Sequence, residues 1–325
     1  MPQSHVSHNT TLPTLRQLVS HTGMGSRVAR MCCVPEENTM TTAPEPGKKT
    51  APGKEPDAAP TPEGAPGVLS LLPMAVLVAV VGTAVRIAVL SGIAAVNEQE
   101  LWDQLTAWDS KYYLEIARVG YFDADIHTDG PVHEITMAFF PGFPILLRVL
   151  GWTGISLEVA ALLVNTLFTA VMAAGVMVLA QRLGAGRRGQ CAAAIVVSSA
   201  PMSIVFSMPY TEALFGALVV WGLVALDERD WWSAAAFGIA LSFVRLTSVD
   251  FLAVFGLWVL LYGRRSWQAW LSLIVASLPL PGYLLWTQRY LAEAGGYFGI
   301  QTEHWNSTFD GGVATVRFVW ETLTE

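Results

Sequence analysis

The chain has 325 residues, of which 53% are hydrophobic and only 14% are charged, and its mean hydropathy is +0.44. Soluble domains carry about 25% charged residues, so this composition predicts an integral membrane protein. The net charge of −7 argues against a nucleic-acid partner, which would need a clustered basic face. Cys32, Cys33 and Cys191 have neither the number nor the spacing of a disulfide framework or a metal site.

Two regions of different composition divide the chain. Residues 1–66 are rich in threonine, proline, glycine and charge, and such a segment buries too little apolar surface to offset the entropy lost on ordering it. We therefore expect residues 1–66 to be a disordered cytoplasmic tail that lacks the apolar core of a signal peptide. Residues 67–325 are predicted to form one transmembrane helical domain.

The apolar runs predict an all-α bundle of about seven membrane spans, because a bilayer core needs roughly 20 apolar residues per helix. The expected spans are 68–96, 157–181, 190–208, 211–226, two short helices between 231 and 262, and 267–287. The polar stretch SFVRLTSVD (242–250) favours two short helices over a single long one.

Arginines in short loops set the expected orientation, because such residues concentrate on the cytoplasmic side. These arginines are Arg182, Arg187, Arg188, Arg264 and Arg265. With the N-terminus in the cytoplasm, all five fall inside only if residues 231–262 form a hairpin. We therefore expect a multi-pass protein of the cell membrane whose segments WDSKYY, PYTE and GIQTEHW meet on the outer face. Any polytopic protein has outer loops, so this meeting alone does not establish a site.

The first outer loop, residues 97–134, has apolar residues at steps of three and four, which predicts an amphipathic helix lying in the membrane interface. This apolar stripe comprises Leu101, Leu105, Trp108, Tyr112, Ile116 and Val119. Asp109 lies at its edge, where an acid needs a partner or a function to offset desolvation. The simpler alternative is that Asp109 pairs with Lys111 or Arg118, or caps a helix that begins near Ser110. Trp108 and Tyr112 would then be ordinary interface aromatics.

The stretch AFFPGFPILL (138–147) contains two prolines in an apolar run. Proline removes a backbone donor and disfavours helix at the residue before it. We expect a turn that packs three aromatic residues against the loop helix, namely Phe139, Phe140 and Phe143. A kinked span without chemistry is the alternative.

Two charged residues mark breaks between later spans. Glu212 follows Pro209 at a helix start, where the helix dipole favours a negative charge, so it is either a helix-start acid or a site residue. Arg245 is an arginine at a membrane turn, and such residues by default have a partner or an anionic ligand. A lipid phosphate is the natural ligand, and snorkelling of the side chain to the headgroups is the alternative.

Four motifs occur in a characteristic order: WDSKYYLEIARVGY (108–121), AFFPGFPILL (138–147), PYTEALF (209–215) and SFVRLTS (242–248). With these motifs the chain resembles the PIG-V family of mannosyltransferases and their bacterial relatives, over roughly residues 70–305. The resemblance implies a GT-C glycosyltransferase, a polytopic helical enzyme with an essential acid in its first outer loop, here Asp109. It also implies a sugar donor carried on polyprenyl phosphate and action on the outer face.

The chain departs from this family's pattern in two ways. Relatives usually continue with several more spans, so we expect a short or C-terminally truncated member. The usual Asn-Gly after the intramembrane arginine is replaced by Leu246-Thr247.

The expected mechanism uses Asp109 as general base on an acceptor hydroxyl and cationic groups to stabilise the leaving phosphate. Arg245 is the first such cation, with Lys111 and Arg118 behind it. The remaining candidate substrate-binding residues are Trp108, Tyr112, Glu212, Gln301 and His304. Direct attack predicts inversion, and we expect no metal or other cofactor. The acceptor stays open as a lipid, a glycan or a protein. A transporter or a catalytically inactive membrane scaffold remains the alternative function.

Overall fold

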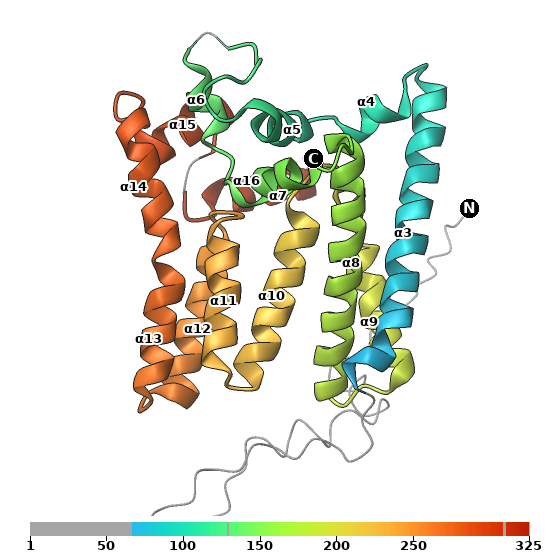
Figure 1. The fold of residues 1–325 in the computed structure, drawn as a ribbon, viewed down its shortest axis with the longest axis vertical. Helices are drawn as coiled ribbons and strands as arrows, with labels where there is room; N and C mark the ends of the chain where they lie inside the picture. The colour runs from blue at the N-terminus through green and yellow to red at the C-terminus, as the bar shows by residue number, and fades with distance from the viewer. Residues whose placement is uncertain (1–66, 129, 308–309, 325) are drawn as a thin grey trace, which may run out of the picture. The chain divides into compact units, whose positions relative to one another are not determined.

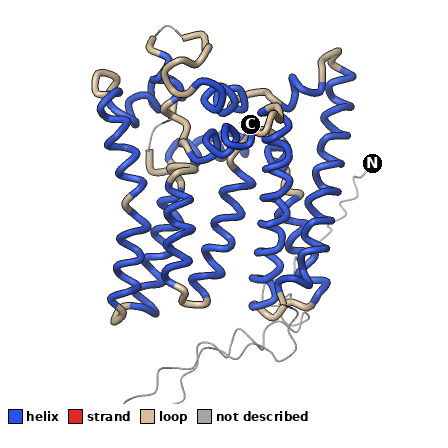
Figure 2. Tube along the Cα trace, viewed as in Figure 1, coloured by secondary structure: helices blue, strands red, loops and turns tan. Residues whose placement is uncertain are grey.

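The computed structural model describes residues 67–128, 130–307 and 310–324, so the expected disordered tail lies outside the described residues and the division at residue 66 stays a prediction. Every regular element in these ranges is a helix (Figure 2), in agreement with the expected all-α class. In chain order these helices are α3 (Val68–Val96), α4 (Leu101–Leu105), α5 (Ser110–Val119), α6 (Val132–Thr136), α7 (Gly142–Gly151), α8 (Leu157–Arg182), α9 (Arg187–Ser198), the 3₁₀ helix η2 (Ser203–Ser207), α10 (Glu212–Asp227), α11 (Trp231–Ser242), α12 (Ser248–Trp258), the π-helix η3 (Val259–Gly263), α13 (Trp267–Ser277), α14 (Pro279–Leu291), α15 (Gly296–Trp305) and α16 (Val313–Thr324).

Three helices of the described part are long and apolar enough to cross a membrane. They are α3 with 29 residues, α8 with 26 residues, and the run of α13 and α14 with 25 residues. The expectation of about seven spans is not confirmed, because α9 to α12 have only 11 to 16 residues each. These shorter helices nevertheless run alongside the long ones in the bundle (Figure 1).

The structure corrects one predicted span and confirms one predicted break. The expected helix over 190–208 is interrupted, because α9 ends at Ser198 and η2 begins only at Ser203. Pro201 lies in this gap, and a proline disfavours helical backbone at the residue before it. The predicted interruption of 231–262 is confirmed, since α11 ends at Ser242 and α12 begins at Ser248.

Helix α3 packs on α8 along one narrow face. Its buried residues recur at steps of three and four, which puts them on the same side of a helix. These residues are Leu71, Ala75, Ala79, Thr83, Arg86, Leu90 and Ala94. Small alanines let the two backbones approach closely. Other apolar side chains of α3 are exposed, with Val80 and Val85 at 51% and 56%, as suits a helix that faces lipid.

The two ends of the bundle differ in character (Figure 1). At one end lie the short loops that carry the five arginines singled out from the sequence, and there Arg182 pairs with Asp227 at 2.7 Å and with Glu228. At the other end lie α4, α5, α6 and α15, together with the break between α11 and α12. The three polar segments singled out from the sequence therefore lie at one common end, opposite the arginine-rich loops.

The expected amphipathic loop helix is two helices rather than one. Helix α4 ends at Leu105 and α5 begins at Ser110. In the turn between them the Thr106 hydroxyl donates to the Trp102 carbonyl at 2.7 Å, and Trp108 adopts a left-handed backbone with φ of 55°. The stripe predicted through Trp108 is therefore broken, and the side chain of Trp108 is 67% exposed.

The proline-bracketed turn packs largely as predicted. Phe139 stacks on Tyr112 of α5 with ring centroids 5.0 Å apart, and Phe143 meets Tyr113 edge-on at 5.6 Å. Phe140 departs from the prediction, because it packs instead against Tyr283 of α14 at 4.3 Å. The turn therefore joins the loop helix to the C-terminal helices.

Three tyrosine hydroxyls supply hydrogen bonds to the non-helical backbone of this turn. Tyr283 donates to the carbonyls of Met137 and Phe139, both at 3.0 Å. Tyr121 also donates to the Phe139 carbonyl, at 2.9 Å, and Tyr297 donates to the carbonyl between them, that of residue 138, at 3.2 Å. Irregular backbone at membrane depth is tolerated only when such partners exist. Residues of α14 and α15 therefore hold the turn in place.

We expect Tyr283→Phe to destabilise the fold, because the Met137 carbonyl loses the one tyrosine donor that it has among the described residues. An unpaired buried acceptor costs about 1–3 kcal/mol. Thermal unfolding in detergent measures this effect. Tyr262→Phe is the matched control, because Tyr262 is 51% exposed. Equal unfolding temperatures for the two variants would contradict the prediction.

Candidate functional site

A cavity of about 540 Å³ lies where the loop helix, the proline turn, the α11–α12 break and α15 come together. Three residues predicted from the sequence line it, namely Asp109, Arg245 and Gln301. The other lining residues are Tyr113, Ala138, Phe139, Phe140, Val244, Leu246, Thr247, Tyr297, Phe298, Trp305 and Ser307. Its wall thus combines aromatic surface with one acid and one guanidinium.

Asp109 occupies the position before the first residue of α5, yet its side chain makes no capping hydrogen bond. Its backbone N–H donates to the hydroxyl of Tyr210 at 3.0 Å. Burial raises the pKa of the Asp109 carboxyl above its ordinary value and the Glu212 carboxylate raises it further, whereas the cations of Arg245 and Lys111 oppose the shift. The helix-cap alternative is therefore wrong for the side chain, and the carboxyl faces the cavity with a raised proton affinity.

Arg245 lies in the break between α11 and α12, and its partners come from the start of α10. Its Nη1 donates to the Glu212 carboxylate and, at 3.4 Å, to the Thr211 hydroxyl. Both members of the Arg245–Glu212 pair are half-buried. The second carboxylate oxygen of Glu212 is buried without a hydrogen-bond partner in the described part of the chain. This pair brings two predicted residues together on one side of the cavity.

A backbone contact fixes where the Arg245 segment lies. The Gly142 N–H donates to the Phe243 carbonyl at 2.7 Å. A Cβ added at Gly142 would lie 2.8 Å from that same carbonyl oxygen, closer than real Cβ atoms approach. The second residue of the PGFP turn is therefore a glycine because two backbones meet there. This contact sets the proline turn and the Arg245 segment against each other.

The sequence analysis did not select Tyr210, which joins the Asp109 segment to the segment before α10. Tyr210 belongs to the PYTE segment, and its hydroxyl accepts the hydrogen bond from the Asp109 amide. The neighbouring Thr211 is fully buried and interacts with Tyr113 as well as with Arg245. Residues 210–212 thus contact the backbone of Asp109 and the guanidinium of Arg245. The only sequence signal was the polar character of PYTE itself.

Trp305 is a second residue that the sequence analysis did not select. It lines the cavity, and its indole N–H is buried without a hydrogen-bond partner among the described residues. Its ring meets Tyr112 and Phe139 edge-on, at 5.4 Å in both cases. An indole held by neighbouring rings with a free donor is suited to a ligand that offers a hydroxyl or carbonyl oxygen.

The other predicted residues have different places. The Lys111 ammonium lies 4.8 Å from the centroid of the Tyr112 ring, and Gln301 donates to the Tyr297 hydroxyl at 3.2 Å. His304 lies 3.6 Å from the Glu134 carboxylate of α6. Neither His304 nor the exposed Trp108 is among the residues that line the cavity.

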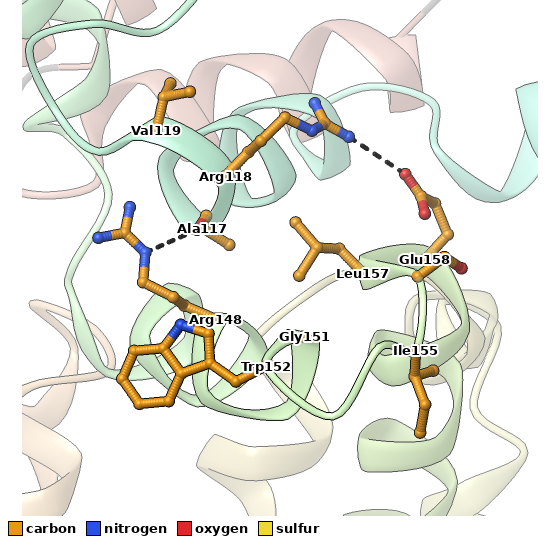
Figure 3. Close-up of a pocket in the computed structure, with 10 residues that line it drawn as sticks. Ala117, Arg118, Val119, Arg148, Gly151, Trp152, Ile155, Leu157 and Glu158 are labelled. Carbon is orange, nitrogen blue, oxygen red and sulfur yellow. Dashed lines mark hydrogen bonds and ion pairs between the residues drawn. The ribbon is translucent and has the colours of Figure 1, made fainter.

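Arg118 lies away from this cavity, along a more open hollow of about 720 Å³ between α5, α7 and the start of α8 (Figure 3). There Arg118 pairs with Glu115 at 2.6 Å and with Glu158 at 3.4 Å. The nearby Arg148 donates to the Ala117 carbonyl at 2.7 Å. Arg118 is therefore not brought together with Asp109 and Arg245.

In the described ranges no group of three or more histidine, cysteine, aspartate or glutamate side chains is arranged to hold a metal ion. The expected independence from a metal stays a prediction.

The fold and the cavity define a helical membrane protein with an acid and an arginine gathered at one end of its bundle. A family profile described as Mannosyltransferase (PIG-V) matches residues 78–278, which is more than half of the chain. The chain therefore belongs to the PIG-V mannosyltransferase family, as the motifs indicated.

Curated relatives match a shorter part of the chain. GPI alpha-1,6-mannosyltransferase 2 of Rattus norvegicus is 34% identical over 165 residues, which cover 46% of this chain and 31% of that protein. The protein of the same name from Mus musculus is 32% identical over 164 residues, with the same coverage. The match thus spans about a third of the relatives' length. No solved structure matches the chain significantly.

We expect Gly142→Ala to destabilise the protein by about 1–3 kcal/mol, as overpacking of a close contact does. The added methyl would displace the Phe243 carbonyl and with it the Arg245 segment. Thermal unfolding measures the effect. Gly282→Ala is the control, since a Cβ there meets nothing within 4 Å. The prediction fails if both variants unfold at the same temperature.

Proposed function

We propose that this protein is an integral-membrane mannosyltransferase that moves a mannosyl group from a polyprenyl-phosphate donor to an acceptor hydroxyl on the outer face of the cell membrane. The observation that carries the proposal is the placement of Asp109 and Arg245 on one cavity at one end of the bundle. Family membership supports sugar transfer. The names of the relatives support mannose and an α-linkage.

Asp109 is the proposed general base. A carboxylate that borders the cavity is suited to take the proton of an acceptor hydroxyl as its oxygen attacks the anomeric carbon. Partial burial and the nearby Glu212 carboxylate raise the pKa of Asp109, which makes its carboxylate a stronger base than that of an exposed aspartate. The Tyr210 hydroxyl holds the Asp109 backbone by accepting its amide hydrogen.

Arg245 is the proposed phosphate-binding residue. As the bond between the anomeric carbon and the phosphate oxygen breaks, its electron pair stays on the polyprenyl phosphate, and a nearby guanidinium stabilises that charge. The Glu212 carboxylate orients the guanidinium through their ion pair. Direct displacement by one nucleophile inverts the anomeric centre, so a β-linked donor gives an α-linked product. No metal is needed in this scheme.

The aromatic wall offers surface for the sugar. Trp305 presents an unpaired indole N–H, and Gln301 lines the cavity beside Tyr297.

The proposed membrane orientation rests on the two ends of the bundle. The arginine-rich loops lie at the end opposite the cavity, and such loops favour the cytoplasmic side. This arrangement supports an orientation with the N-terminus in the cytoplasm and the cavity on the outer face.

We expect Asp109→Asn to lower mannosyl transfer by about 100- to 10,000-fold, the usual contribution of a general base. The measurement is transfer of radiolabelled mannose from polyprenyl-phosphate mannose into lipid and protein fractions of membranes that contain the protein. Asp103→Asn is the matched control, because Asp103 is an exposed aspartate of the same loop. Equal transfer by Asp109→Asn and wild type would remove Asp109 as the base. No transfer by well-expressed wild type would favour an inactive scaffold.

The pH dependence of transfer provides a second test. The base must be deprotonated, so the rate falls as pH falls through the pKa of Asp109, which lies above its ordinary value. Glu212→Gln removes a carboxylate that raises this pKa and frees the positive charge of Arg245. We therefore expect the acidic limb of the kcat profile to move to lower pH in Glu212→Gln. A limb that stays in place or moves upward would contradict the assignment.

A further inference from the structure

Arg86 is a buried cation on an apolar helix. It lies within α3, one of the three helices able to cross a membrane, and is only 7% exposed. A charged side chain at such a place is rare and costly, and it persists where partners and a role offset its desolvation. No part of the mechanism above uses Arg86, and it is not among the residues that line the cavity.

The guanidinium of Arg86 bonds to the last residue of α9 and to the last residue of η2, and so to both sides of the segment that contains the α9–η2 break. Its Nε donates to the Ser207 hydroxyl at 2.8 Å, and its Nη1 donates to the Ser198 carbonyl at 3.0 Å. The remaining Nη2 donates to the Thr83 hydroxyl at 3.1 Å, one turn earlier on α3. Ser198 is the last residue of α9 and Ser207 the last residue of η2. One side chain therefore fixes the path of the chain across the whole interruption.

The fixed end of this interruption leads directly to the cavity. At the next residue, Met208, the carbonyl accepts a hydrogen bond from Asn165 of α8, a residue with no exposed surface. The same carbonyl accepts the Tyr210 N–H at 2.7 Å. The Tyr210 hydroxyl then accepts the Asp109 amide, and residues 211 and 212 hold Arg245. Hydrogen bonds and the short chain segments between them thus connect α3 to the backbone of Asp109 and to the guanidinium of Arg245.

We propose that Arg86 is a positioning residue that sets Tyr210 against Asp109 through the α9–η2 break. The effect on turnover rests on the function proposed above, whereas the effect on the Asp109 backbone does not. An arginine is required because three nitrogens in a fixed plane reach three separate acceptors. A lysine ammonium is a single point charge on a flexible stem and does not replace that geometry.

The first variant is Arg86→Lys, which keeps the charge. The second is Ser207→Ala, which removes only one of the three acceptors and serves as the test if Arg86→Lys does not fold. Arg182→Lys is the control, because Arg182 also bridges two helices but lies at the end of the bundle away from the cavity. A misplacement of about 1 Å lowers catalysis up to about 100-fold. We expect Arg86→Lys to lower kcat by about 10- to 100-fold with a smaller change in KM, and Arg182→Lys to leave both unchanged.

A double-mutant cycle with Tyr210→Phe separates positioning from general stabilisation. Tyr210→Phe removes the hydroxyl that receives the Asp109 amide. If Arg86 acts through this hydroxyl, adding Arg86→Lys to Tyr210→Phe lowers kcat by less than about twofold, because the two changes break the same link. A full additional loss, equal to that of Arg86→Lys alone, would overturn the proposal.

Amide hydrogen exchange of the segment that contains Asp109 gives a readout independent of transfer. We expect faster exchange of residues 107–113 in Arg86→Lys and in Ser207→Ala than in wild type, because the Asp109 amide loses a well-placed acceptor. Exchange in Arg182→Lys should match wild type. Unchanged exchange in both Arg86→Lys and Ser207→Ala overturns the proposal even if transfer is active. Faster exchange with no transfer by wild type supports the positioning role and rejects the proposed function.

Discussion

The fold depends on hydrogen bonds to the non-helical backbone segments that interrupt an apolar helical bundle. Lipid offers no such bonds, so the protein must provide them. Tyr121, Tyr283 and Tyr297 serve the three carbonyls of the proline turn, and Arg86 serves the break after α9. Polar side chains therefore cluster where helices end. The need to pair the backbone at these ends thus also determines where a polar cavity forms.

The charges around the Asp109 carboxyl are equal in number and opposite in sign. Asp109 and Glu212 stand against Arg245 and Lys111 in the electrostatic environment of the Asp109 carboxyl. Lys111 is exposed, and for the three partly buried groups the nearby opposite charge lowers the cost of removing each from water. Arg245 makes its hydrogen bonds to the helix that begins at Glu212, whereas the Asp109 side chain has no hydrogen bond or ion pair in the described part of the chain. The arginine is thus held in place, and the acid is left open to a ligand.

The sequence was most informative where a local pattern decides the structure. Apolar length predicted α3 and α8, the polar stretch around Arg245 predicted the break between α11 and α12, and the prolines predicted the packing of Phe139 and Phe143. Sequence patterns did not predict contacts between segments that are distant in the chain. The contact of Asp109 with Tyr210 joins positions 101 residues apart, and no periodicity encodes it. The helix stripe through Trp108 also failed, because the left-handed backbone at Trp108 ends the regular spacing there.

The contact between Gly142 and Phe243 involves only backbone atoms on the Phe243 side. The Phe243 side chain therefore takes no part in this contact, whereas the buried Val244 side chain packs in one cluster with Phe139 and Phe143 of the turn. Leu246 and Thr247, which follow the arginine, line the cavity. The position of the arginine thus depends in part on a glycine in a distant segment, and not only on the residues beside the arginine.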